Sequence, residues 1–137
     1  MCIRDRILTP AKVLAGDELR DKVGSSPGET LQGELGVSAS AFGAGASRPI
    51  IRGMEGARVK MLENGMATSD VSGLSNDHAV ASEGAVARQI EILRGPAALL
   101  YGSGAIGGLV NVVNERIPTE LEAKPCLLYT SPSPRDS

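Results

Sequence analysis

The chain has 137 residues, a formal net charge of −2, 17 glycines, one phenylalanine, two tyrosines and no tryptophan. The slight acidic excess gives no indication of the positively charged surface that nucleic-acid binding needs, and no apolar run is long enough for a transmembrane helix. Because so few aromatic side chains would give an independent domain only a thin core, the composition indicates a domain that is stabilised inside something larger.

The two ends of the chain are related to each other at the level of DNA. Residues 1–5 read MCIRD and residues 126–130 read CLLYT, and the two strands of one DNA stretch can encode these two runs. We therefore interpret residues 1–6 and 126–137 as translated sequencing adapter around an internal fragment, and exclude them from the fold. Cys2 and Cys126 both lie in these ends, so we expect no disulfide and no thiolate metal site.

The N-terminal third favours short helices joined by turns. Residues 17–22 combine helix formers with early acids and a late lysine, which suits the helix dipole. After a break in GSSPGE, at residues 24–29, Pro27 is expected to open a second helix that includes Leu35 and ends at Gly36.

The middle of the chain, from Val37 onward, is rich in small residues and glycine. Residues 48–53 predict a short strand with Pro49 at its start or on a sheet edge. Residues 58–62 alternate moderately and are followed by the turn signal ENG. Residues 67–83 are polar and aperiodic, so we expect an exposed loop.

The C-terminal part predicts two strands around a glycine-rich segment. Residues 89–93 alternate like a strand, residues 96–101 favour a short helix that begins with proline, and residues 109–113 favour a β-branched strand. Residues 102–107 read GSGAIG, which fits the pattern G-x-G-x-x-G. A dinucleotide site needs a strand before such glycines and a helix after them, and here that order is reversed. A nucleotide-binding enzyme is therefore a weak alternative, which a helix after Gly108 would favour.

Close backbone packing accounts better for these glycines, because glycine permits sharp turns and close approach to a neighbouring surface. Three runs carry a resemblance to a known family: RPIIRG at residues 48–53, IEILRGP at 90–96 and LYGSGAIGGLVNV at 100–112. Their sequence and order resemble the plug domain of TonB-dependent outer-membrane receptors. The resemblance gives residues 7–118 as the plug and residues 119–125 as the start of a linker to a barrel that follows. Within it we assign a structural glycine motif made of Gly53, Gly95, Gly102, Gly104, Gly107 and Gly108.

The resemblance implies an α+β fold, with a small mixed β-sheet, short helices and long loops. It places the domain in the outer membrane of a Gram-negative bacterium, inside the lumen of its own barrel of about 22 strands. There the plug would close the pore, take part in ligand binding and be rearranged when the inner-membrane protein TonB pulls on a segment before it. In the family, arginines that match Arg52 and Arg94 pair with acids of the barrel wall. The resemblance implies a transport component, not an enzyme, and no cofactor.

The ligand is suggested by the run SNDHAV, at residues 75–80, which holds the single histidine of the chain. Asp77 and His78 supply oxygen and nitrogen donors that suit zinc, and their place resembles that of a zinc-binding pair in zinc-uptake receptors. The prediction is therefore uptake of zinc or another metal ion, with an iron chelate such as a siderophore as the alternative. A solvated loop histidine is the ordinary structural reading of the same residues.

The remaining expectations concern other classes of function and one ion pair. A free-standing interaction domain is a third class of function, and it would lack the long downstream run of alternating β-segments that a receptor plug predicts. Catalysis has no support, because no nucleophile–base arrangement is evident. We expect Glu91 to form a structural ion pair with Arg94 at a strand end.

Overall fold

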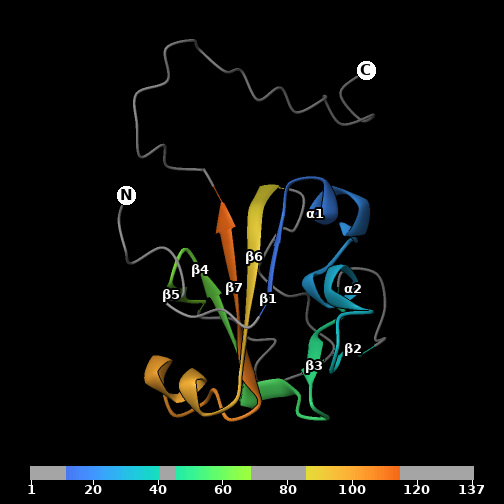
Figure 1. Ribbon diagram of the computed structural model, residues 1–137. Helices are drawn as coiled ribbons and strands as arrows, with labels where there is room; N and C mark the ends of the chain where they lie inside the picture. The colour runs from blue at the N-terminus through green and yellow to red at the C-terminus, as the bar shows by residue number, and fades with distance from the viewer. Residues whose placement is uncertain (1–11, 41–45, 69–85, 115–137) are drawn as a thin grey trace, which may run out of the picture.

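The computed structural model describes residues 12–40, 46–68 and 86–114. These residues form a five-stranded sheet in the order β1-β6-β7-β4-β5 and a two-stranded sheet of β2 and β3 (Figure 1). The strands are β1 (Lys12–Ala15), β2 (Val37–Ala39), β3 (Pro49–Ile51), β4 (Val59–Glu63), β5 (Met66–Ala67), β6 (Ala87–Arg94) and β7 (Gly108–Asn114). The helices are α1 (Gly16–Lys22), α2 (Pro27–Leu31) and the 3-10 helices η1 (Gly56–Arg58) and η4 (Pro96–Tyr101). This mixed sheet with short helices confirms the predicted α+β class.

The centre of the large sheet is formed by β6, β7 and β4. β6 and β7 pair antiparallel with Ile92 opposite Val110, whereas β4 and β7 pair parallel with Met61 opposite Val110. The strands expected over residues 58–62, 89–93 and 109–113 are therefore present, each with bounds shifted by one or two residues. Because the side chains of β6 alternate, Ile90 and Ile92 reach one face of the sheet and Leu93 the other.

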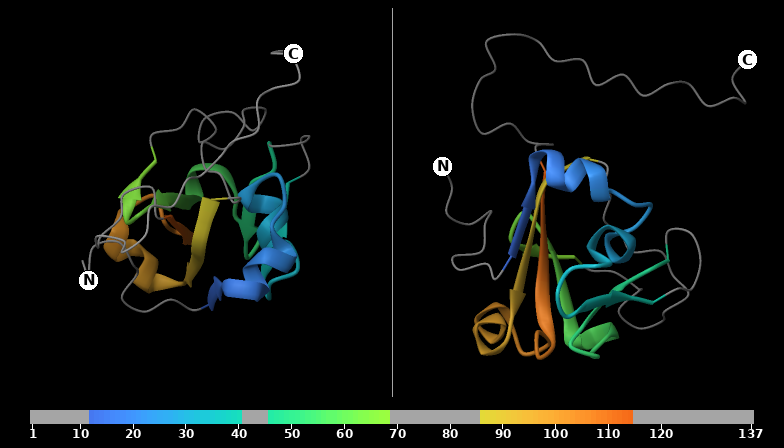
Figure 2. Two further views of the ribbon diagram at one scale, coloured as in Figure 1. Left: turned by 90° about the horizontal axis from the view of Figure 1, so that it is seen from above. Right: turned by 45° about the vertical axis from the view of Figure 1, so that its right-hand side comes forward.

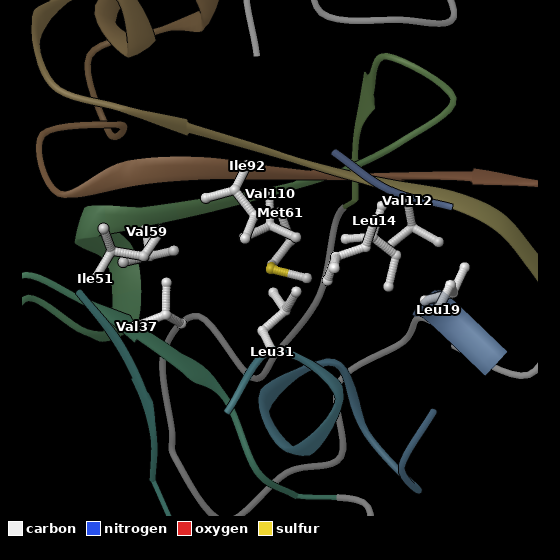
Figure 3. Close-up of a cluster of buried hydrophobic side chains, with 11 residues drawn as sticks. Leu14, Leu19, Leu31, Val37, Ile51, Val59, Met61, Ile92, Val110 and Val112 are labelled. Atoms are coloured by element: carbon white, nitrogen blue, oxygen red, sulfur yellow. The ribbon is translucent and has the colours of Figure 1, made fainter. Parts of the chain in front are cut away.

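The main core lies between the sheet and a layer made of α1, α2 and the β2–β3 hairpin. Figure 2 shows these elements together on one side of the large sheet. In Figure 3, Leu31 of α2 points toward Met61 and Val110 of the sheet. The buried members of this cluster are Leu14, Leu19, Leu31, Val37, Ile51, Val59, Met61, Ile90, Ile92, Val110 and Val112. All are aliphatic or Met, so the core forms without aromatic side chains.

The second face of the sheet carries a smaller apolar cluster. Ala98 of η4 and Ala105, which follows it, pack against the strands and are fully buried, and Tyr101 packs partly buried beside them. The strand members of the cluster are Leu62, Leu93 and Leu109. The short helix expected over residues 96–101 is present as the 3-10 helix η4, which this cluster holds against the sheet.

The second N-terminal helix is shorter than predicted. The side chain of Ser26 caps α2 by accepting from the Glu29 N–H at 3.3 Å, but the helix ends at Leu31 and not at Gly36. Gly33 has a φ of 100°, a left-handed conformation that ends a right-handed helix. Leu31 is fully buried before this turn, whereas Leu35 beyond it is 84% exposed, so the apolar spacing of the two leucines did not indicate a continuous helix.

The strands β1 and β2 were not anticipated, since each is too short to show a period. β1 pairs antiparallel with β6, and Leu14 is fully buried. Nζ of Lys12 lies 2.7 Å from Oε1 of Glu18, and Nζ of Lys22 lies 2.5 Å from Oε1 of Glu34. The hydrogen bonds from Lys12 and Lys22 lower the pKa of Glu18, and the hydrogen bond to Glu34 raises the pKa of Lys22. These ion pairs connect β1, α1 and the turn after α2.

The predicted loop at residues 67–83 begins inside β5, which ends at Ala67, and most of it falls outside the described residues. Within the part of the chain that the structure describes, no helix has the length and apolar character needed to cross a bilayer.

Candidate functional site

Two arginine–glycine pairs meet at one end of the five-stranded sheet. Arg52 and Gly53 follow β3, whereas Arg94 ends β6 and is followed by Gly95. The φ angles of the glycines are 75° at Gly53 and 86° at Gly95, so the chain turns after each arginine in a way that favours glycine. A Cβ atom on Gly95 would lie 4.0 Å from Nη1 of Arg52. The fold thus brings together two motifs that are distant in the sequence.

Neither of these guanidinium groups forms an ion pair within residues 12–40, 46–68 and 86–114, unlike the cationic groups of Lys12, Arg20 and Lys22. Arg52 is exposed and Arg94 is half-buried. Nε of Arg94 is buried and has no hydrogen-bond partner in that part of the chain. A buried N–H without an acceptor is unfavourable. An acceptor supplied from another part of the protein would remove this cost.

Glu91 does not pair with Arg94, so that prediction is wrong. Side chains three positions apart on a strand point to opposite faces. Glu91 is only 1% exposed. Its Oε2 accepts from Nδ2 of Asn111 at 3.0 Å and its Oε1 accepts from Nε2 of Gln89 at 2.6 Å. The carboxyl group is therefore held by amide side chains on the second face of the sheet.

The contact between Glu91 and Asn111 belongs to a row of polar contacts across β6, β7 and the β4–β5 turn. Oδ1 of Asn111 accepts from the N–H of Gly65 at 3.0 Å. Asn64 and Asn114 bond twice, because Nδ2 of Asn64 donates to Oδ1 of Asn114 at 2.9 Å and Oδ1 of Asn64 accepts from the N–H of Asn114 at 3.0 Å. The sequence reasoning missed this row, although an asparagine inside the apolar run LVNVV was a signal of it.

The glycine-rich segment lies against η1 and the start of β4. The N–H of Gly107 donates to the carbonyl of Arg58 at 2.8 Å, and a Cβ atom on Gly107 would come within 2.8 Å of Cβ of Met54. A Cβ atom on Gly104 would lie 3.2 Å from the carbonyl oxygen of Ala57. No larger residue fits this approach at Gly107 without displacing its neighbours.

The neighbouring Gly102 and Gly108 flank the same segment. Lys60 reaches across it, and its Nζ donates to the carbonyl of Tyr101 at 2.7 Å, next to Gly102. Gly108 is the first residue of β7. A strand, and not a helix, therefore follows these glycines, and the element order that a dinucleotide site requires is not the order found here.

The proposed metal ligands Asp77 and His78 lie outside the described residues. Among the residues that are described, no group of three or more His, Cys, Asp and Glu side chains is arranged to hold a metal ion. The structure therefore supplies no geometry for the predicted zinc site.

Comparison with protein families gives a match to the TonB-dependent Receptor Plug Domain over residues 5–109. The arginine–glycine turns, the glycine segment and strands β1 to β6 lie within this match, which ends near the start of β7. The class of protein is thereby defined as a receptor plug, located in the outer membrane within a barrel lumen, and not an enzyme. The chain belongs to the family of TonB-dependent receptor plug domains.

Two relatives share short, similar segments with the chain. A probable TonB-dependent siderophore receptor, PirA of Acinetobacter baumannii, is 50% identical over 48 residues, which are 35% of this chain and 6% of that protein. The ferric enterobactin receptor PirA of Pseudomonas aeruginosa is 62% identical over 32 residues, which are 23% of this chain and 4% of that protein. The chain thus matches only a small part of the length of these relatives.

Solved structures show the same fold. The siderophore receptor PirA from Acinetobacter baumannii superposes with a TM-score of 0.63 at 24% identity, covering 81% of this chain and 19% of that one. The siderophore receptor PirA from Pseudomonas aeruginosa superposes with a TM-score of 0.58 at 27% identity, covering 77% of this chain and 18% of that one. These relatives are siderophore receptors and not zinc receptors, so the resemblance to the zinc-uptake subgroup is not supported.

Proposed function

We propose that this chain is the plug of a receptor that takes up an iron chelate of the siderophore class. The observation that carries the proposal is the 62% identity over 32 residues with a receptor named for ferric enterobactin. This reading replaces metal-ion uptake as the main hypothesis, and zinc bound through Asp77 and His78 becomes the second candidate. The barrel that follows the plug and the inner-membrane protein TonB are the proposed partners, together with the chelate itself.

The domain bounds are part of the same proposal. Residues 7–118 form the plug and residues 119–125 begin the linker to the barrel. Residues 1–6 and 126–137 are adapter-derived and take no part in function. The complete open reading frame from the same DNA source would test these bounds, because natural flanking sequence should replace both ends and a run of alternating β-segments should follow the linker.

The ligand can be tested with the complete receptor that carries this plug. We expect it to bind ferric enterobactin, measured by equilibrium titration, and we expect His78→Ala to leave the affinity for zinc unchanged. The reason is that two donors alone do not complete a zinc site.

The zinc hypothesis predicts the opposite pattern in the same two titrations. Zinc affinity would fall at least about tenfold, or about 1.4 kcal/mol, in the His78→Ala receptor, and ferric enterobactin would not bind. Asp77→Ala should then behave like His78→Ala. That combined result would contradict iron-chelate uptake and restore the metal-ion assignment.

We also propose that Arg52 and Arg94 anchor the plug to carboxylates of the barrel wall. The proximity of Arg52 to Gly95 and the unpartnered Nε of Arg94 support this role. Charge-assisted bonds between a guanidinium and a carboxylate are strong and directional, yet they can be exchanged for water when a load separates the partners. Such an anchor would hold the plug at rest and still permit its rearrangement.

Reversing the charge at residue 94 should loosen the plug in the complete receptor. We expect Arg94→Glu to raise the hydrogen-exchange rates of β6 amides about tenfold or more, because one charge-assisted bond contributes about 1.5–3 kcal/mol. Arg20→Glu is a matched control, since the side chain of Arg20 is 83% exposed on α1. Unchanged exchange in the Arg94→Glu receptor would rule out the anchoring role.

A further inference from the structure

The turn between β4 and β5 consists of Asn64 and Gly65, which form the only Asn–Gly step in the chain. Both residues have a positive φ, 49° at Asn64 and 78° at Gly65, as a type I′ hairpin turn requires. An asparagine followed by glycine is also chemically reactive, because glycine has no side chain to keep its nitrogen away from the side-chain amide carbon of the asparagine. This turn is therefore the place in the sequence best suited to deamidation.

Deamidation at such a step takes place within the chain. The nitrogen of Gly65 gives up its proton and bonds to Cγ of Asn64, the bond between Cγ and Nδ2 breaks, and ammonia leaves with the proton. Water then opens the resulting cyclic imide and yields aspartate or isoaspartate at residue 64. The reaction consumes only water, and it requires that the Gly65 nitrogen and the Asn64 amide are free to approach each other.

The neighbouring strand β7 holds both reacting groups. The N–H of Gly65 donates to Oδ1 of Asn111 at 3.0 Å. The amide of Asn64 is bonded through both of its polar atoms to Asn114, at 2.9 Å and 3.0 Å. The N–H of Asn64 donates to the carbonyl of Val112 at 2.9 Å. The attacking nitrogen and the amide that it must reach are thus held by different residues of β7, and they must leave this strand before they can react.

We propose that Asn64 is a self-modification site that β7 keeps unreactive, and that it deamidates when the β4–β5 turn opens. The strand β5 lies at the edge of the five-stranded sheet (Figure 1), and both of its residues are exposed. A short, exposed edge opens at a lower free energy than the centre of a sheet. The rate of modification therefore follows the population of the open turn. This chemistry goes beyond the proposed uptake function and involves neither the chelate nor the barrel.

Deamidation prevents the turn from closing again in its original form. An ionised carboxylate at residue 64 has no hydrogen to donate to Oδ1 of Asn114. It also adds negative charge beside Glu63, whose Oε1 accepts from Nδ2 of Asn114. Isoaspartate lengthens the main chain by a methylene group, which disrupts the pairing of Leu62 with Ala67. The modification thus converts a transient opening of the sheet edge into a permanent one.

The test measures deamidation at residue 64 of the complete receptor by peptide mass spectrometry after incubation in mildly alkaline buffer. We expect the denatured receptor to react at least about tenfold faster than the folded one, which corresponds to about 1.4 kcal/mol of protection. In the folded receptor, Asn114→Ala should raise the rate about three- to tenfold, because it removes the acceptor of the Asn64 amide. Hydrogen exchange of the β1 amides should stay unchanged, because the opening is local to the turn.

Two further variants serve as controls. Ser40→Ala also removes a side-chain acceptor, since Oγ of Ser40 accepts from the N–H of Arg48 at 3.2 Å, but it lies at the two-stranded sheet. It should leave the deamidation rate of Asn64 unchanged. Asn64→Gly keeps a residue that tolerates a positive φ and removes the reactive amide, so the corresponding peptide should no longer gain the mass of an amide-to-acid conversion.

Three outcomes would overturn the proposal. Equal rates in the folded and the denatured receptor would show that β7 does not protect the turn. An Asn114→Ala receptor that reacts no faster than the parent receptor, or no faster than Ser40→Ala, would show that the contact with Asn114 is not the cause of protection. A deamidation rate that rises together with hydrogen exchange of the β1 amides would assign the protection to global stability and not to the contacts of the turn.

Discussion

Replacing Gly108 with alanine is expected to destabilise the plug by about 2–5 kcal/mol. Gly108 has a φ of 152°, which is strained for any residue with a side chain. The added Cβ atom would also lie 2.9 Å from Cδ1 of Ile51 and 2.9 Å from the carbonyl oxygen of Leu93. The leucine carbonyl belongs to the neighbouring strand β6 and cannot move aside without breaking the sheet. Hydrogen exchange of β6 and β7 amides in the complete receptor measures the loss.

The matched control for this prediction is Gly16→Ala. Gly16 also has a positive φ, 58°, but a Cβ atom there would meet nothing within 4 Å. It should cost only the backbone strain of about 1–2 kcal/mol. If the two alanine variants prove equally stable, close packing at Gly108 is not the reason for its glycine.

Replacing Asn111 with leucine is expected to cost about 2–4 kcal/mol of plug stability, although leucine has a similar size. Asn111 is fully buried. Its loss removes a donor from the carboxyl group of Glu91 and an acceptor from the N–H of Gly65. The carboxyl group of Glu91 would then be buried with fewer partners, and the half-buried N–H of Gly65 would lose its acceptor. The change in stability is measured by denaturant titration of the complete receptor, with hydrogen exchange of the β7 amides as the readout.

A double-mutant cycle tests whether the buried pair is the cause. Glu91→Leu combined with Asn111→Leu should cost less than the sum of the two single changes, because removing both partners leaves no orphaned group between them. Additive costs would show that the two side chains do not stabilise each other. The cycle also gives the coupling free energy of a contact that sequence reasoning had assigned to Arg94.

Both predictions concern the same central strand. β7 joins β6 to β4, and it meets the arginine–glycine end of the sheet at Gly108 and the polar row at Asn111. Arg94 ends β6 opposite Gly108 of β7, and η4 lies in the connection between these two strands. We therefore expect mutations in β7 to affect the fit of the plug in its barrel as well as its internal stability.

The pattern of apolar residues was sufficient to find the long central strands. Ile90 and Ile92 alternate with polar neighbours, and Val110 and Val112 lie in a β-branched run, so the period of two identified β6 and β7 directly. The same pattern did not reveal β1 or β2, because three or four residues do not establish a period. Nor did it show that α2 ends before Gly33, because the spacing of Leu31 and Leu35 suggested a longer helix.

The candidate site, like the fold, could be predicted from the sequence only in part. The motifs around Arg52 and Arg94 and the glycine segment were visible as short runs, and their order resembled one family, which the comparison confirmed. Their proximity was not visible, because it depends on a turn after β3 and a strand end in β6. The partner of Glu91 was predicted wrongly. The sequence shows that Arg94 is near along the chain, but it does not show that Asn111 lies opposite Glu91 in the sheet.

The sequence by itself determined the family, the α+β class, the central strands and the presence of a glycine-rich segment between two of them. These follow from local properties, namely side-chain period, turn preference and backbone freedom, which short runs of residues carry with them. Only the tertiary structure decided the parallel pairing of β4 with β7, the meeting of Arg52 with Gly95, the buried contact between Glu91 and Asn111, and the contacts that hold the β4–β5 turn to β7. Each of these depends on strand order and register, which are fixed when distant segments bury their apolar faces together.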